Sequence, residues 1–233
     1  MSENLDSRYF IVLDKDKIIF FCLNSKNKIL FKQNYDFINY NPVNSYLALE
    51  NFLNENLIKI EKDLNVFIRK IFIIVDLENT LIADLSLRHY FQKEKNNQHT
   101  INDLLILLKN QFAKYSNDQK IIHMVISKFL IDGKESDLSS INENFENLTL
   151  EVQFECLKDH TVIALKKILS KYQISLEKII SANFLKKFSQ NRTSDIIYSA
   201  NKIINGELKN EVISVKKKPK NTGFFENFFH LFG

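Results

Sequence analysis

Strand-type and helix-type patterns alternate along this chain in an order that leaves few folds open. Three short segments rich in Ile, Phe and Val, at residues 9–13, 17–23 and 28–32, are separated by polar turns and predict three strands. A long helix is expected next, with Asn41 as its cap and Pro42 as its first residue. The chain therefore begins with a strand meander that one amphipathic helix can cover.

The middle of the chain predicts an inserted unit of one strand, one helix and two further strands, spanning residues 70–157. Its first strand is the continuous apolar run 71–77, and its helix has one apolar face between residues 101 and 112. A long strand is expected at 121–131. In the last strand, 148–157, apolar and polar residues alternate, which predicts one buried face and one face in water.

The remaining elements complete a mixed α/β order. A helix is expected to follow Asp159 as its cap, and a short strand is expected at 178–181. Residues 193–205 predict another helix, which Gly206 would end. Strands and helices in this order predict the mixed α+β class.

Glycine is scarce, with four in 233 residues: Gly133, Gly206, Gly223 and Gly233. Loops that bind phosphate need closely spaced glycines, because the backbone N–H groups must approach the anion. The spacing therefore excludes a P-loop, a dinucleotide-binding fingerprint and a kinase loop. No nucleophile elbow is present either, so the chain is not expected to be an enzyme or to hold a cofactor.

Other candidate sites are also weak. The histidines show no metal-ligand spacing, and His123 is expected to pack within a strand. Asp14 and Asp16 read as turn residues more readily than as part of a carboxylate site, for which the other candidates are Asp76 and Asp84. The two cysteines, Cys22 and Cys156, are expected to be buried, reduced thiols of a cytosolic protein.

The end of the chain carries the clearest functional signal. On a helical projection, the large apolar side chains of residues 223–233 share one side and the polar ones the other, which predicts an amphipathic helix too short to span a bilayer. Residues 207–222 before it predict a basic linker, which favours lipid attraction or plain solvation over nucleic-acid binding. The helix is expected to rest on a membrane or in a partner's groove; packing on the protein's own core is the alternative. The predicted membrane-binding residues are Phe224, Phe225, Phe228, Phe229, Leu231 and Phe232, with Lys216, Lys217, Lys218 and Lys220.

This arrangement resembles the bacterial cell-division protein FtsA family, which are actin-like membrane tethers. Three features carry the resemblance: the order of elements, the stretch IIHMVISKFLIDG followed by LTLEVQFECLKDHTVIALKKILSKYQISLEKII, and the end, TSDIIYSANKIINGE with the later GFF helix. The resemblance implies a partial actin-like (ribonuclease H-like) subdomain from residues 1–69 and 158–206. Residues 70–157 would be its strand-helix-strand-strand (SHS2) module.

Two departures from the family pattern bear on function. The family's first hairpin carries an Asp-x-Gly-Ser/Thr phosphate loop, but here the matching residues are Asp14, Lys15, Asp16 and Lys17. Residues 182–192 stand where the family has its second half, with the adenosine site and the main surface for FtsZ. ATP binding is therefore not expected, and the SHS2 module and the terminal helix are what remains.

The resemblance implies a peripheral division scaffold on the cytoplasmic side of the inner membrane. Its implied partners are membrane lipids, FtsZ and other division proteins, together with self-association through the module. A second interpretation is an adaptor of a pilus-type or other envelope assembly, whose last helix docks into a partner protein. An ATPase is disfavoured by the glycine count.

Overall fold

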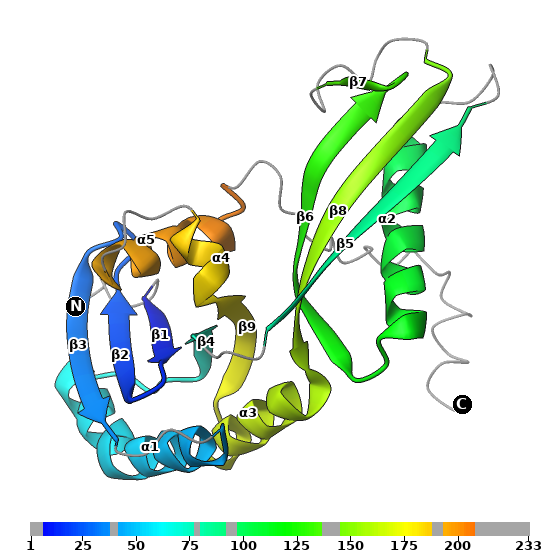
Figure 1. Ribbon diagram of the computed structural model, residues 1–233. Coiled ribbons are helices and arrows are strands. Elements are labelled where there is room, and N and C mark those ends of the chain that lie inside the picture. Colours follow the sequence, from blue (N-terminus) through cyan, green and yellow to red (C-terminus); the bar gives the residue numbers. More distant parts are fainter. Residues whose placement is uncertain are drawn as a thin grey trace, which may run out of the picture.

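The described chain forms two β-sheets, one covered by four helices and the other by one (Figure 1). The computed structural model describes residues 7–37, 42–76, 80–91, 97–136, 145–187 and 193–207. The fold class is mixed α+β, as predicted.

The first sheet has five strands, in the order β3-β2-β1-β4-β9. The first three strands are antiparallel neighbours, while β1, β4 and β9 run parallel to one another. Their positions confirm the predicted meander and place the apolar run near residue 71 in this sheet, between β1 and the edge strand β9. The bounds are Arg8–Leu13 for β1, Lys17–Leu23 for β2, Ile29–Asp36 for β3, Lys70–Val75 for β4 and Ser175–Ser181 for β9.

Helices cover both faces of the five-stranded sheet. Helices α1 (Pro42–Leu64) and α3 (Asp159–Lys171) lie on one face, and α4 (Ala182–Lys186) and α5 (Thr193–Ile204) lie on the other (Figure 1). Within β1, alternate side chains belong to different cores: Ile11 faces α1 and α3, as Leu13 does, while Phe10 and Val12 face α4 and α5. A sheet covered on both faces needs continuous apolar strands, which explains the unbroken apolar runs in β1, β2 and β4.

The second sheet has four strands, in the order β5-β8-β6-β7, and one helix on one face. Its elements are β5 (Leu81–Tyr90), α2 (Asn97–Tyr115), β6 (Gln119–Ile131), β7 (Lys134–Glu135) and β8 (Asn147–Lys158). The predicted buried face of β8 is confirmed, since its apolar residues are buried with those of α2. The predicted wet face is wrong, because Thr149 and Glu155 are buried and Glu151 and Gln153 are half-buried in this central strand. The α2 face is the predicted one, formed by Ile101, Leu104, Leu105, Leu108 and Phe112.

Local signals fix several element ends as predicted. Asp132 and Gly133, with φ of 48° and 78°, form the left-handed turn that joins β6 to β7. Gly206, with φ of 72°, follows α5, and its N–H donates to the Ile203 carbonyl at 3.0 Å. Pro42 is the first residue of α1.

The predicted insert boundary at residue 70 is wrong. Strand β4 pairs with β1 and β9 in the five-stranded sheet, so the strand-helix-strand-strand unit consists of β5, α2, β6 and β8 and begins at Leu81. A run that is apolar on both faces suits a sheet covered on both faces, whereas the four-stranded sheet needs alternation. Strand β5 was not predicted, although its Leu-x-Ala-x-Leu-x-Leu spacing is such an alternation.

Two smaller differences concern helix starts. Asp159 is the first residue of α3, and Lys158 is its N-cap, without a side-chain cap. An acidic residue in the first turn still stabilises the helix by interaction with its dipole. The short helix α4, at Ala182–Lys186, was not predicted; the Ser181 side chain caps it by accepting from the Phe184 N–H.

Candidate functional site

The carboxyl ends of β1, β4 and β9 lie side by side, and this edge is where open α/β sheets bind ligands. In the strand register, Leu13 is paired with Val75, and Val75 is paired with Ser181. Asp14 and Asp76 are the residues that follow β1 and β4. The edge is therefore the first place to look for a binding site.

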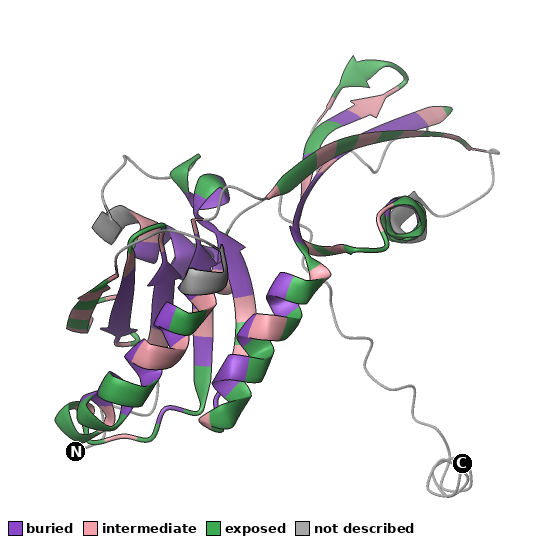
Figure 2. Cartoon of the chain, turned by 60° about the horizontal axis from the view of Figure 1, so that its bottom comes forward, coloured by how far each residue is buried: buried purple, intermediate pink, exposed green. Residues whose placement is uncertain are grey.

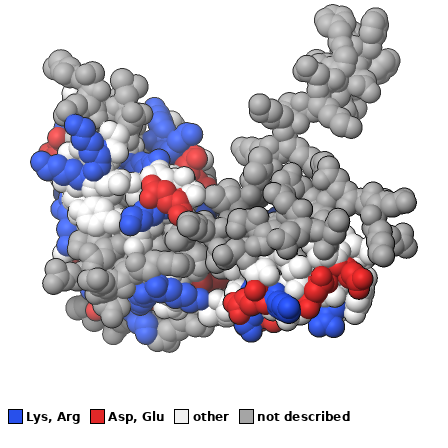
Figure 3. Space-filling model, turned by 90° about the horizontal axis from the view of Figure 1, so that it is seen from above, with Lys and Arg blue, Asp and Glu red and all other residues white. Residues whose placement is uncertain are grey.

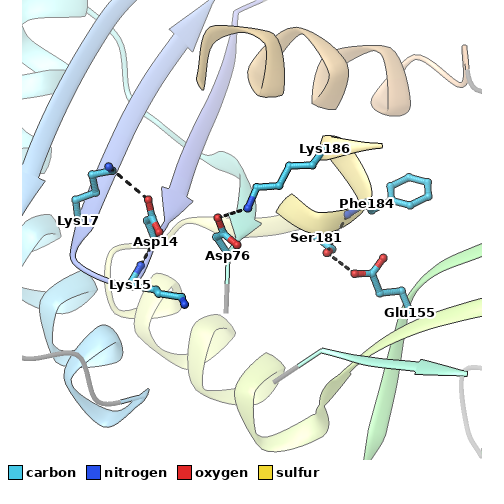
Figure 4. A network of polar contacts seen from close by, with 8 residues as sticks. All are labelled: Asp14, Lys15, Lys17, Asp76, Glu155, Ser181, Phe184 and Lys186. Carbon is cyan, nitrogen blue, oxygen red and sulfur yellow. Dashed lines mark hydrogen bonds and ion pairs between the residues drawn. The ribbon is translucent and has the colours of Figure 1, made fainter. Parts of the chain in front are cut away.

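The hairpin between β1 and β2 uses its own polar groups. The Asp14 carboxylate accepts a hydrogen bond from the Lys15 N–H at 2.8 Å and forms an ion pair with the Lys17 ammonium at 3.5 Å (Figure 4). The Asp14 N–H donates to the Lys17 carbonyl at 3.0 Å. The predicted turn role of Asp14 is confirmed, and the hairpin presents a carboxylate in place of a glycine-rich backbone.

Asp76 is held in a similar way at the end of β4. Its N–H donates to the Leu13 carbonyl at 2.9 Å, and its carboxylate accepts from the Lys186 ammonium of α4 at 2.8 Å (Figure 4). Of the described residues here, Asp14 and Asp76 are thus each paired with a lysine of the same chain. Within the described ranges, no group of three or more His, Cys, Asp or Glu side chains could hold a metal ion.

A buried polar cluster joins the two sheets next to this edge. Ser181, at the end of β9, donates its hydroxyl hydrogen bond to the Glu155 carboxylate of β8, and its N–H donates to His123 Nε2 of β6 at 3.0 Å. His123 and Glu155 are only 2% and 3% exposed. We call His123, Glu155 and Ser181 the junction cluster.

Geometry in the junction cluster fixes how the sheets meet. The His123 ring stacks on the Phe184 ring with centroids 4.0 Å apart, while the Phe184 N–H donates to Ser181 Oγ at 3.3 Å. Buried polar groups that satisfy one another favour a single arrangement, so the cluster specifies one orientation of the four-stranded sheet. The prediction that His123 packs within a strand is confirmed.

The face of the four-stranded sheet opposite α2 is polar and internally paired. Asp84 accepts from the Gln153 amide at 3.0 Å, and Lys128 forms an ion pair with Glu151 at 3.4 Å. The Arg88 Nε–H donates to the Thr149 hydroxyl at 3.2 Å. Figure 3 shows acidic and basic side chains interspersed over the part on the right, which carries this sheet. This mixed face suits a protein partner better than a polyanion.

The two cysteines are free and buried, one in each sheet, as predicted. Burial raises the pKa of the Cys22 thiol, and burial together with the neighbouring Glu155 carboxylate raises the pKa of Cys156 to about 12. A thiol that resists ionisation is a poor nucleophile and a poor metal ligand. Both cysteines therefore act as small core residues.

Few of the predicted site residues meet. Asp14 and Asp76 share the carboxyl edge, whereas Asp84 lies on the other sheet. The ten predicted membrane-binding residues, between Lys216 and Phe232, lie outside the described residues. No helix within the described ranges is long and apolar enough to cross a membrane.

Sequence reasoning missed the junction cluster. Glu155 was expected on the wet face of its strand, and Ser181 was not singled out. His123, Glu155 and Ser181 come from three strands that are distant in sequence, and no local sequence pattern predicts that they contact one another. The weak signal available was a carboxylate near the end of a strand that continues directly into a helix.

No protein-family model matches the chain, and no curated protein sequence does. Three solved structures of similar arrangement carry the following names. One is the cytoplasmic domain of EpsL, an inner-membrane component of the type II secretion system of Vibrio cholerae, with TM-score 0.37 and 9% identity over 76% of this chain and 58% of that one. Another is the PilM–PilN type IV pilus biogenesis complex, with TM-score 0.45 and 7% identity over 78% of this chain and 49% of that one. The third, from Bacteroides thetaiotaomicron, has an actin-like ATPase fold and unknown function, with TM-score 0.34 and 15% identity over 78% and 55%. The chain thus spans roughly half the length of these structures, and none of these values assigns it to a family.

Proposed function

We propose that the chain is a non-enzymatic scaffold, tethered to the cytoplasmic face of a membrane, that holds protein partners on its four-stranded sheet. The five-stranded sheet is the support, the junction cluster fixes the presenting sheet on it, and residues 223–233 supply the tether. In this proposal the five-stranded sheet is an actin-like subdomain that does not bind a nucleotide.

One observation carries the non-enzymatic part of this proposal. At the carboxyl edge, Asp14 and Asp76 are engaged by Lys17 and Lys186 at 3.5 and 2.8 Å, and Asp14 also accepts from the Lys15 N–H. A triphosphate without a metal ion would be repelled by these two carboxylates, and a Mg²⁺ ion bridging them to the phosphates would first have to displace their lysines. Phosphate sites instead present glycine backbone and a helix N-terminus.

The tether rests on the sequence pattern of residues 223–233. Each large apolar side chain immersed at the lipid interface contributes about 1 kcal/mol or more. Each lysine of the preceding linker adds about 1 kcal/mol against anionic lipid. Ordering the helix opposes part of this gain, so a reversible anchor is expected.

Co-sedimentation of the intact chain with vesicles that contain anionic lipid tests the tether. We expect Phe228→Asp to abolish pelleting, while Asn227→Asp, which adds the same charge on the polar side, retains most of it. Equal pelleting of the two variants would contradict an amphipathic anchor. Retained pelleting after deletion of residues 223–233 would do so as well.

The finer proposal is a division scaffold, because the FtsA-like features are spread over most of the sequence. An adaptor of another envelope assembly is the second candidate. It is favoured because the carboxyl edge has no glycine-rich phosphate loop, and because only residues 182–192 stand where the FtsA family has its second actin-like half. A fluorescent fusion of the intact chain in its own cells separates the two. Mid-cell bands support division, whereas foci away from mid-cell support the adaptor.

A further inference from the structure

We propose that a second copy of this chain pairs with β5, antiparallel and about a two-fold axis at Ser86, so that two four-stranded sheets become one continuous sheet. This inference stands apart from the proposed function, because it depends only on the edge and side chains of β5. The occupant is a second copy because β5 is complementary to itself.

Strand β5 is a long and regular edge. It ends the sheet order β5-β8-β6-β7, and its ten residues pair with β8 without a register shift. Its sequence, LIADLSLRHY, contains neither proline nor lysine, two of the residues that proteins use to block strand addition, and its charged residues are Asp84 and Arg88. Among the described elements, only β8 pairs with it.

The backbone pattern shows which residues face outward. The Phe91 N–H donates to the Glu146 carbonyl at 2.8 Å, and Tyr90 is opposite Asn147, so odd-numbered residues of β5 bond toward β8. In an antiparallel ladder the even-numbered residues then direct their N–H and C=O groups out of the sheet. These groups belong to Ile82, Asp84, Ser86, Arg88 and Tyr90.

Self-pairing about Ser86 matches these five residues to one another. Asp84 lies opposite Arg88 of the second copy, and Arg88 opposite its Asp84, so two ion pairs form by symmetry. Ile82 lies opposite Tyr90, and these are 47% and 68% exposed in the single chain. Even-numbered residues oppose even-numbered residues, so about ten backbone hydrogen bonds can form across the axis.

The neighbouring registers are poorer. A shift that centres the axis on Asp84 places the two Asp84 carboxylates opposite each other, and like charges directly opposed are destabilising. A shift toward Tyr90 leaves Ile82 without an opposing residue of the strand. On the other face, the Ser86 register puts Leu85 opposite Leu87, and both already pack on the α2 core. The apolar layer therefore continues across the axis.

The intrachain contacts of the two charged residues leave this pairing possible. Asp84 uses one carboxylate oxygen to accept from Gln153, and Arg88 uses its Nε–H for Thr149. The second carboxylate oxygen and the terminal guanidinium N–H groups are the atoms that an opposing strand would meet.

Sedimentation velocity of the full-length chain over a range of concentrations tests the pairing, using Asp84→Arg, Arg88→Asp and the double variant. Each single reversal creates two like-charge pairs, so we expect the dimer Kd to rise about tenfold or more. The double reversal restores opposite charges and should return the Kd to near the wild-type value. A monomer at all concentrations, or equal effects of the single and double variants, would overturn the proposal.

Association through the terminal helix is separated by the variant Phe228→Asp. If β5 carries the dimer, this variant keeps the wild-type Kd. If it alone abolishes the dimer, the β5 proposal is wrong. Circular dichroism of each variant shows that the charge reversals leave the fold intact.

Discussion

The five-stranded and four-stranded sheets solve the problem of burial differently. The five-stranded sheet is covered on both faces, and its strands β1, β2 and β4 are apolar almost throughout. Among the described elements, the four-stranded sheet has a helix on one face only, and exposed residues alternate with half-buried ones along β5 from Ile82 onward (Figure 2). The first sheet is therefore buried on both faces, whereas the second has one polar face and an edge strand, β5, that pairs only with β8 among the described elements.

The largest expected effect tests whether the two sheets share one folding unit. Phe154→Ala removes a buried ring that stacks on Phe112 at 4.9 Å, and should lower the free energy of unfolding by about 3–5 kcal/mol. Phe20→Ala in the five-stranded sheet should cost a similar amount. Because the junction cluster joins the sheets, we expect one cooperative urea transition in both variants. Two separate transitions would show that the sheets unfold independently.

The junction cluster itself is tested by Ser181→Ala. This change leaves the buried Glu155 carboxylate without its hydroxyl donor and should cost about 1–3 kcal/mol of unfolding free energy. Ser170→Ala is the matched control, because the exposed Ser170 hydroxyl donates only to the Lys167 carbonyl of its own helix. Equal stability losses in the two variants would argue against a cluster that holds the sheets together.

Alkaline pH probes the four-stranded core through Cys156. Its pKa is raised to about 12 in the folded chain, so the unfolded chain loses this proton first as the pH rises. The thiol therefore lowers the free energy of unfolding above pH about 9, by about 1.4 kcal/mol per unit, until the pH reaches the folded pKa.

Cys156→Ala should remove this part of the pH dependence. Denaturation at pH 8 and pH 10 measures it as the difference between the wild type and the variant. Stability curves that stay parallel would contradict a buried, protonated thiol.

The smallest effect is expected on the open polar face. Lys128→Ala breaks an ion pair with Glu151 whose two side chains are 53% and 36% exposed, and should change the free energy of unfolding by less than about 0.5 kcal/mol. Thermal denaturation of this variant beside Phe154→Ala measures the contrast between the two faces of one sheet. A large loss would mean that the polar face contributes to stability and is not reserved for partners.

The sequence predicted most elements because their signals are local. Alternation in β8, the apolar face of α2, Pro42 at a helix start and Gly206 after a helix each need only neighbouring residues. The predicted insert boundary was wrong because an apolar run such as that of β4 does not indicate which of the two sheets the strand will join. The junction cluster left only a weak signal in the sequence, since Ser181 meets His123 and Glu155 only after the two sheets have packed.

The central claim is that lysines of the chain itself occupy the carboxylates at the carboxyl ends of β1 and β4. Equilibrium binding of Mg-ATP to the full-length chain tests this claim most directly. With Asp14 and Asp76 engaged by lysines, we predict no saturable heat in calorimetry and no rise in melting temperature at millimolar nucleotide. A saturable rise that Asp14→Ala or Lys186→Ala changes would contradict the account and return the five-stranded sheet to nucleotide binding.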